Sequence, residues 1–245
     1  ARSSGPGVGQ EGRRGRASRV LPRAGVRAVR AVPGASGSEG DVIAALYVQD
    51  GGCYFGLDGV DPWPEARDAR LYDGPHAVVA HPPCARWSKL AGFVEYVYPG
   101  RFPKGQDGGC FAAALASVRK FGGVLEHPEG SAAWAAFGLN HPPRGGGWVA
   151  ADWHGGWTCC VEQGAYGHKA RKATWLYAAG VELPSLRWGS APGDFEWTSF
   201  LEYNTEDGRR RASRTGIVQR MSKRQRAATP IEFRDLLISI ARSAR

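Results

Sequence analysis

The sequence of 245 residues is long enough for one large domain, and its 42% hydrophobic share is sufficient for a sizeable core. The net charge of +9 and the pI of about 9.6 favour an anionic partner, with nucleic acid as the first candidate. No apolar run approaches the length of a membrane-spanning helix, and no signal-peptide pattern is found. Five cysteines without framework spacing favour a reducing, cytoplasmic compartment.

Residues 1–40 differ in composition from the rest of the chain. They hold eight Arg and nine Gly but no aromatic residue. Such a segment cannot bury enough apolar surface to order itself, so we expect a disordered basic leader. It supplies +6 of the total charge, which weakens the charge argument for residues 41–245. An arm that follows phosphates and a leader without function both remain open.

The folded domain is expected over residues 41–245. Strands are expected at residues 42–48, 53–57, 77–80, 124–125, 158–161 and 173–178, and helices at 64–70, 110–121, 131–137 and 231–241. The first two strands would form a hairpin, because Asp50-Gly51-Gly52 is a turn signal. The later alternation of strands and helices favours an α/β fold with a largely parallel sheet and flanking helices. Residues 92–109 are a candidate lid or binding loop.

The stretch around Cys84 is the strongest candidate for chemistry. Pro82 and Pro83 end the strand at 77–80, because proline cannot continue a sheet ladder and fixes φ. Cys84 should therefore stand on a stiff loop at the carboxyl end of a strand, where open α/β sheets bind ligands. With Arg86 nearby it is a candidate nucleophile, and the alternative is a small buried residue without reactivity.

Two later segments complete a pattern with Pro82-Pro83-Cys84. The strand at 124–125 runs into Glu126-His127-Pro128, and the basic turn His168-Lys169-Ala170-Arg171-Lys172 precedes the strand at 173–178. In this order the three segments resemble those of the cytosine-C5 DNA methyltransferases, which carry Pro-Cys, then Glu-Asn-Val, then Gln-x-Arg-x-Arg. The chain is also similar to short methyltransferase-like phage proteins, over residues 60–63, 65–72, 74–76 and 228–235.

The resemblance implies a reduced Rossmann-like (methyltransferase-like) domain that uses S-adenosylmethionine, acts on DNA and works in a bacterial or phage-infected cell. It implies that the Cys84 thiolate attacks C6 of cytosine, that Glu126 protonates N3, and that Arg171 anchors the base or a phosphate. An enclosed glutamate with this task would have a raised pKa. The substrate-binding residues implied are Pro82, Pro83, Arg86, His127 and Lys169.

The cofactor segment departs from the family pattern. In the family a glycine-rich turn and a helix follow the first strand, whereas here only about nine residues separate that strand from Asp58-Gly59. Asp61 and Asp58 are the candidate cofactor-binding acids. A target-recognition region of the usual size is absent, so either the cofactor is held differently or the chain acts on another pyrimidine.

Other functions remain open. The main alternative is a nucleic-acid-binding module with a decayed active site, which S-adenosylmethionine binding would separate from the enzyme. A Cys–His hydrolase with His127 or His168 as its base is another. The candidate zinc ligands are Cys159 and Cys160 with His154 and His168, or His81 with Cys84 and His127. No metal site is expected, because adjacent cysteines lack the usual spacing of zinc ligands. Residues 209–226 hold eight basic residues and no acid, which favours phosphate contacts.

Overall fold

The computed structural model describes residues 42–192, residue 206 and residues 221–245. The chain divides into two units, Ala1–Ser36 and Gly37–Arg245, and the described residues all belong to the second. The expected leader at 1–40 lies outside the described residues, as do positions 209–220 of the expected basic segment. None of the described helices is long and apolar enough to cross a bilayer.

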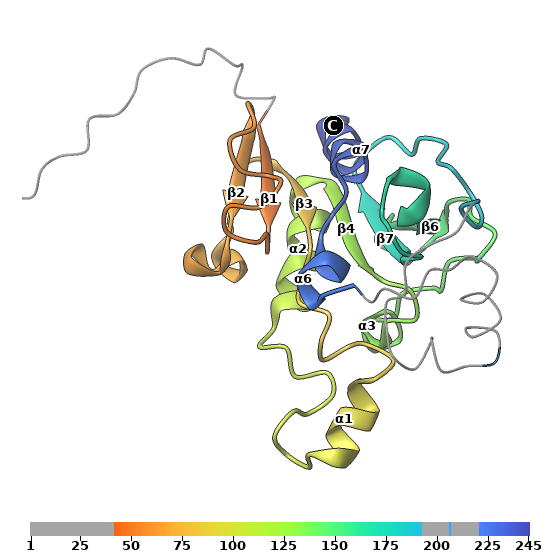
Figure 1. The fold of residues 1–245 in the computed structure, drawn as a ribbon. Helices are drawn as coiled ribbons and strands as arrows, with labels where there is room; N and C mark the ends of the chain where they lie inside the picture. Colours follow the sequence, from red (N-terminus) through yellow and green to blue (C-terminus); the bar gives the residue numbers. More distant parts are fainter. Residues whose placement is uncertain (1–41, 193–205, 207–220) are drawn as a thin grey trace, which may run out of the picture. The chain divides into compact units, whose positions relative to one another are not determined.

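The domain is built on one seven-stranded sheet in the order β2-β1-β3-β4-β7-β6-β5 (Figure 1). The strands are β1 (Ile43–Leu46), β2 (Val60–Trp63), β3 (Ala77–Ala80), β4 (Gly123–Pro128), β5 (Val149–Ala150), β6 (Trp157–Glu162) and β7 (Ala173–Ala179). Strands β2, β1, β3 and β4 pair in parallel, whereas β4–β7, β7–β6 and β6–β5 are antiparallel pairs. The α/β class is confirmed, but the sheet is mixed, with half of its strand pairs antiparallel.

Helices lie on both faces of this sheet. The helices among the described residues are α1 (Ala91–Val97), α2 (Cys110–Phe121), α3 (Ala132–Ala136), α6 (Lys223–Ala227) and α7 (Ile231–Arg242), with 3-10 turns η2 (Glu65–Arg67), η3 (Ala69–Leu71) and η4 (Gln163–Tyr166). The two that cover opposite faces of the sheet are α2 and α7. Phe111 of α2 packs in one core cluster and Phe233 of α7 in the other. Neighbouring residues of β4 alternate between them, because Leu125 joins the first cluster and Val124 the second.

Helix α2 starts and stops for local reasons. The Asp107 carboxylate accepts hydrogen bonds from the backbone N–H groups of Gly109 (3.0 Å) and Phe111 (2.8 Å), which satisfies the first turn. Gly122 ends the helix with a φ of 76°. Gly123 then enters β4, where a Cβ atom would lie 2.0 Å from the Val78 carbonyl oxygen, so only glycine fits. This tight junction sets α2 against the centre of the sheet.

The first part of the domain differs from the sequence prediction. Residues 53–57 form turns, so the predicted hairpin is wrong, and β2 lies parallel to β1 instead. β2 contains Pro62, which has no N–H to donate. An edge strand tolerates this residue because it forms hydrogen bonds with one neighbour only, here β1. The predicted helix at 64–70 is replaced by η2 and η3, which are separated by Asp68 with a φ of 46°.

The parallel half of the sheet has a topological switch point. The chain passes from β1 to β2 on one side, and then returns to β3 on the other side of β1. In open α/β sheets a crevice forms outside the carboxyl ends of the strands where the order reverses in this way. The carboxyl ends of β1, β3 and β4 therefore define the edge at which a functional site is expected.

Candidate functional site

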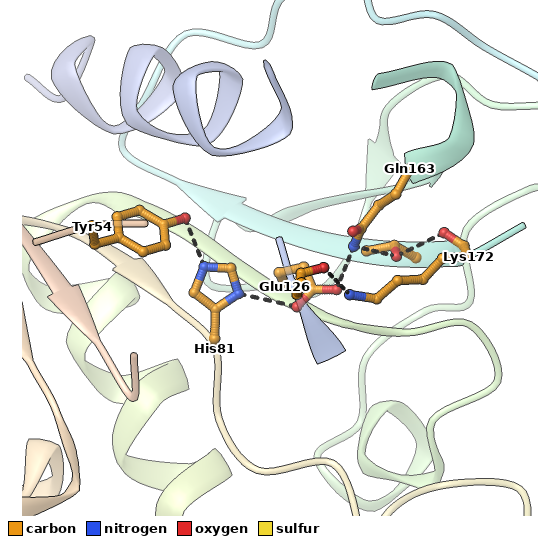
Figure 2. Close-up of polar contacts among 7 residues, drawn as sticks. Tyr54, His81, Glu126, Gln163 and Lys172 are labelled. Atoms are coloured by element: carbon orange, nitrogen blue, oxygen red, sulfur yellow. Dashed lines mark hydrogen bonds and ion pairs between the residues drawn. The ribbon is translucent and has the colours of Figure 1, made fainter. Parts of the chain in front are cut away.

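Glu126 lies at the carboxyl half of β4 and is the centre of a buried polar chain (Figure 2). The side chain is 11% exposed, and each of its oxygens accepts a hydrogen bond. His81 Nδ1 lies 3.1 Å from Oε2, and Gln163 Nε2 lies 2.9 Å from Oε1. Because an ionised carboxylate only accepts, the His81 Nδ1 atom carries the proton of the first bond.

His81 is the residue that links Glu126 to the Cys84 loop. It follows β3 directly, and its backbone N–H extends the β1–β3 ladder by donating to the Leu46 carbonyl at 3.0 Å. Its Nε2 atom lies 2.8 Å from the buried hydroxyl of Tyr54, which comes from the turns between β1 and β2. The imidazole is thus held between two partners on two different elements.

The other side of Glu126 is built by the segment before β7. Gln163 Nε2 also donates to Thr174 Oγ1 at 2.9 Å, which fixes the amide group. Lys172 immediately precedes β7, and its Nζ atom lies 3.5 Å from the Ala228 carbonyl oxygen after α6. The antiparallel register that pairs Pro128 with Thr174 brings this basic end of β7 to the carboxyl end of β4.

These neighbours decide the charge of Glu126. Burial alone would raise its pKa, but the hydrogen bond with His81 and the positive charge of Lys172 lower it to about 2. The carboxyl group is therefore ionised at neutral pH in the absence of a ligand. The expected raised pKa of Glu126 is wrong for this state, because the sequence pattern did not include His81 or Lys172 among its neighbours.

His127 is a buried neutral side chain beside the same loop. Its Nδ1 atom lies 2.7 Å from Ser131 Oγ, and its ring packs against Phe111 and Trp134. Burial lowers the pKa of His127 to about 4, although Glu126 and the backbone of Pro82 and Pro83 act in the opposite direction. His127 and the two prolines, which were predicted to bind substrate, lie together.

Cys84 stands on an anchored loop and is partly exposed. Its carbonyl oxygen accepts the Trp87 N–H at 3.0 Å. The Trp87 indole N–H donates to Asp107 at 2.8 Å, and the Trp87 carbonyl accepts the Ala132 N–H at 2.9 Å. Cys159 and Cys160 are buried instead, and burial raises the pKa of both. Cys84 therefore has the accessibility and the rigid setting that a nucleophile needs.

The basic residues are arranged differently from the prediction. Lys169 and Arg171 are exposed, and the basic side chain whose charge acts on Glu126 is Lys172. The guanidinium of Arg86 lies 4.6 Å from the centre of the Phe102 ring, and both residues belong to the segment that follows Cys84. Lys172 therefore supplies the positive charge that acts on Glu126 in this structure.

The two predicted cofactor acids lie away from the carboxyl end of β2. Asp61 is the second residue of β2, and its carboxylate accepts from Arg67 and from the Trp63 indole N–H at 2.7 Å. Asp58 precedes β2, and its carbonyl oxygen accepts from Arg242 of α7. The acid that follows β2 is Glu65, which lines a crevice of about 640 Å³ with residues 48–50, 64 and 66. Asp58 and Asp61 are not among its lining residues.

No group of three metal-binding side chains occurs among the described residues. Cys159 and Cys160 alternate along β6, and they pack into the two opposite core clusters. Their thiols therefore point to different faces of the sheet and do not share a ligand. The sequence analysis gave no role to Gln163, Lys172 or Glu65 and weighed His81 only as a zinc ligand, although each of the four is a polar residue within two residues of the end of a strand.

Comparisons with protein-family models, with curated proteins and with solved structures found no match to this chain.

Proposed function

We propose that this protein is a cytosine-C5 methyltransferase-like enzyme whose Cys84 thiolate attacks a pyrimidine base of DNA. The observation that carries the proposal is the contact of His81, three residues before Cys84, with Glu126 at 3.1 Å. The cysteine loop and the carboxylate leave neighbouring parallel strands at the same edge of the sheet. In this proposal β2, β1, β3 and β4 are the reduced Rossmann-like half of the domain.

The chemistry needs a nucleophile, an acid and a cation around one base. Addition of the Cys84 thiolate forms a bond to C6, and the electron pair of the C5–C6 double bond is displaced into the ring. A proton from Glu126 on N3 neutralises the negative charge, and Lys172 stabilises charge on the ring carbonyl. After C5 gains a methyl group, a water molecule would take the C5 proton, and the C6–S bond would break to release the Cys84 thiolate. N3 would return its proton to Glu126, which restores the neutral aromatic ring. A base in a duplex must leave the stack to enter such a site.

The crevice beside Glu65 fits a nucleoside-type cofactor. Its volume of about 640 Å³ lies within the usual range for small-molecule sites, and it opens at the carboxyl ends of β1 and β2. Glu65 would accept hydrogen bonds from ribose hydroxyls, as the acid after a second strand does in dinucleotide sites. S-adenosylmethionine bound there would supply the methyl group.

The segment after Cys84 offers a surface for DNA. It contains α1, which lies apart from the sheet (Figure 1). Phe93 is 65% and Tyr96 is 82% exposed, which is unusual for large rings in a folded domain. The segment also carries Arg86, Arg101 and Lys104. Exposed rings among cationic side chains are the combination that stacks unpaired bases and binds phosphates.

Covalent trapping tests the proposal directly. DNA containing 5-fluorocytosine should form a stable adduct in the presence of S-adenosylmethionine, because fluorine blocks the final elimination. Cys84→Ser should abolish the adduct, and Cys53→Ser, at another partly exposed cysteine, should leave it unchanged. Equal adduct formation by Cys84→Ser would overturn the assignment of the nucleophile.

One observation favours the alternative of a nucleic-acid-binding module with a decayed active site. Glu126 is ionised and both of its oxygens are bonded within the protein, so the resting site cannot protonate a base. Binding of DNA without S-adenosylmethionine binding and without adduct formation would support this alternative.

A further inference from the structure

We propose that His81 is a positioning residue that gives Glu126 the proton required by cytosine, through a relay formed by Tyr54, His81 and Glu126. This inference rests on the proposed function, because it assigns the source of the proton in that reaction. The relay is carried by two contacts, from Tyr54 Oη to His81 Nε2 at 2.8 Å and from His81 Nδ1 to Glu126 Oε2 at 3.1 Å (Figure 2).

The partners of His81 allow it to exchange a proton without losing a hydrogen bond. A tyrosine hydroxyl can donate to a neutral ring nitrogen or accept from a protonated one. When the imidazolium is present, Nδ1–H donates to Glu126 and Nε2–H donates to Tyr54. Transfer breaks the Nδ1–H bond and forms an Oε2–H bond, which leaves a neutral imidazole whose Nε2–H still donates to Tyr54. No heavy atom has to move for this step.

The surroundings of Glu126 make such a source necessary. Its carboxylate faces His81 after β3, Gln163 of η4 and the charge of Lys172 before β7, with His127 next to it on β4. Gln163 donates a neutral amide hydrogen, and Lys172 favours the ionised form. Burial lowers the pKa of His127 to about 4, so this ring is neutral at pH 7. Among the described side chains that contact Glu126, His81 alone has two ring nitrogens that keep their hydrogen bonds while one proton is given up.

The two pyrimidine bases of nucleic acids differ in their need for this proton. Cytosine N3 has no hydrogen and only accepts, so it needs a protonated Glu126. Uracil N3 carries a hydrogen and donates it to an ionised carboxylate. A carboxylate offers about four acceptor positions, of which His81 and Gln163 use two, so a base can be added to the site. The relay therefore predicts that loss of His81 slows the reaction with cytosine and leaves the rate of the reaction with uracil nearly unchanged.

The test compares trapping rates on two DNA duplexes that carry 5-fluorocytosine or 5-fluorouracil at the same position. His81→Gln keeps a polar side chain of similar reach but cannot release a proton at neutral pH. We expect the cytosine adduct to form about 10²–10⁴-fold more slowly, which is the usual range for proton transfer by a positioned side chain. The uracil adduct should change by no more than a few fold. Equal slowing on both bases would overturn the relay in favour of a structural role.

Two variants complete the series. Tyr54→Phe keeps the ring that packs in the core and removes the hydroxyl, and it should slow the cytosine adduct while sparing the uracil adduct. His154→Gln, at an exposed histidine in the β5–β6 turn, should change neither rate. Unchanged cytosine trapping in Tyr54→Phe would remove Tyr54 from the relay and leave His81 as its end.

A measurement without DNA separates failure of the relay from failure of the proposed function. Carbon-13 labelling of glutamate carboxyl groups follows the titration of Glu126 by NMR, with assignment through Glu126→Gln. In His81→Gln the pKa of Glu126 should rise, because the strongest partner that favours the ionised form is lost. Cytosine trapping should still slow, because the other described side chain bonded to the carboxylate, Gln163, delivers no proton during the reaction. If the unmodified protein gives no adduct with either base, the proposed function fails, and an unchanged titration of Glu126 would then overturn the relay as well.

Discussion

Acid should weaken this fold through His127. The imidazole is buried to 1% exposure, and burial lowers its pKa to about 4 against an ordinary value of 6.5. The unfolded chain therefore binds a proton on this residue more readily than the folded one does. As the pH falls from about 6.5 to 4, the free energy of unfolding should decrease, and the loss persists at lower pH.

The difference between these two pKa values corresponds to a loss of about 3 kcal/mol in the free energy of unfolding. Near pH 5 this free energy should change by about 1.4 kcal/mol per pH unit. Urea unfolding followed by tryptophan fluorescence at pH 7, 6 and 5 measures this slope. His127→Asn removes the titrating ring and keeps an amide that can form a hydrogen bond with Ser131. Between pH 6 and 5, the free energy of unfolding of this variant should therefore fall less steeply, by about 1.4 kcal/mol per pH unit. His154→Asn changes an exposed histidine and should keep the original slope.

The comparison isolates His127 from other acid-sensitive groups. His168 is also buried, and burial lowers its pKa, but it is present in both proteins and cancels in the difference. Glu126 has a folded pKa of about 2, so its contribution is present above its ordinary pKa of 4.5 and is lost only between about 4.5 and 2. An identical slope between pH 6 and 5 in His127→Asn would refute the argument.

Three further outcomes are expected. Gly123→Ala should lower the free energy of unfolding by more than about 3 kcal/mol in urea titrations, because the new Cβ atom would lie 2.0 Å from the Val78 carbonyl oxygen. Gly92→Ala in α1 is the control and should show no such loss, because no atom lies within 4 Å of its new Cβ. Tyr96→Ala should weaken binding of single-stranded DNA by about 1–3 kcal/mol in fluorescence anisotropy, with unchanged stability. Glu65→Gln should reduce the heat of S-adenosylmethionine binding in calorimetry, and unaltered binding would exclude the crevice.

Elements with a strong local pattern were predictable from the sequence. The alanine-rich helix at 110–121 and the apolar strands at 77–80 and 173–178 lie where they were expected. β2 was missed because Asp61-Pro62 is typical of a turn, and only its position at the sheet edge makes the proline harmless. Strand direction was also beyond local reasoning, since an apolar run has the same pattern whether its neighbour is parallel or antiparallel.

The candidate site shows the same division between local and non-local information. Cys84 and Glu126 were found because each follows or ends an apolar run and is near proline. Lys172 was not singled out beside Arg171, because only the register of β7 against β4 decides which basic residue of this turn acts on Glu126. The raised pKa expected for Glu126 failed for a related reason, since His81 is distant in sequence and reaches it through the pairing of β3 with β4.

The mixed sheet is what places unlike groups on the two sides of Glu126. On the parallel side, the carboxyl end of β3 brings His81 and the cysteine loop, because parallel neighbours end at the same edge. On the antiparallel side, β7 begins where β4 ends, so the turn before β7 contributes Lys172 and Gln163 at that edge. A parallel strand in the place of β7 would bring its carboxyl end there instead, with a different loop. The antiparallel strand, which departs from the predicted largely parallel sheet, therefore brings the cation and the amide to the carboxylate. The parallel strand brings His81 and the loop of the candidate nucleophile Cys84.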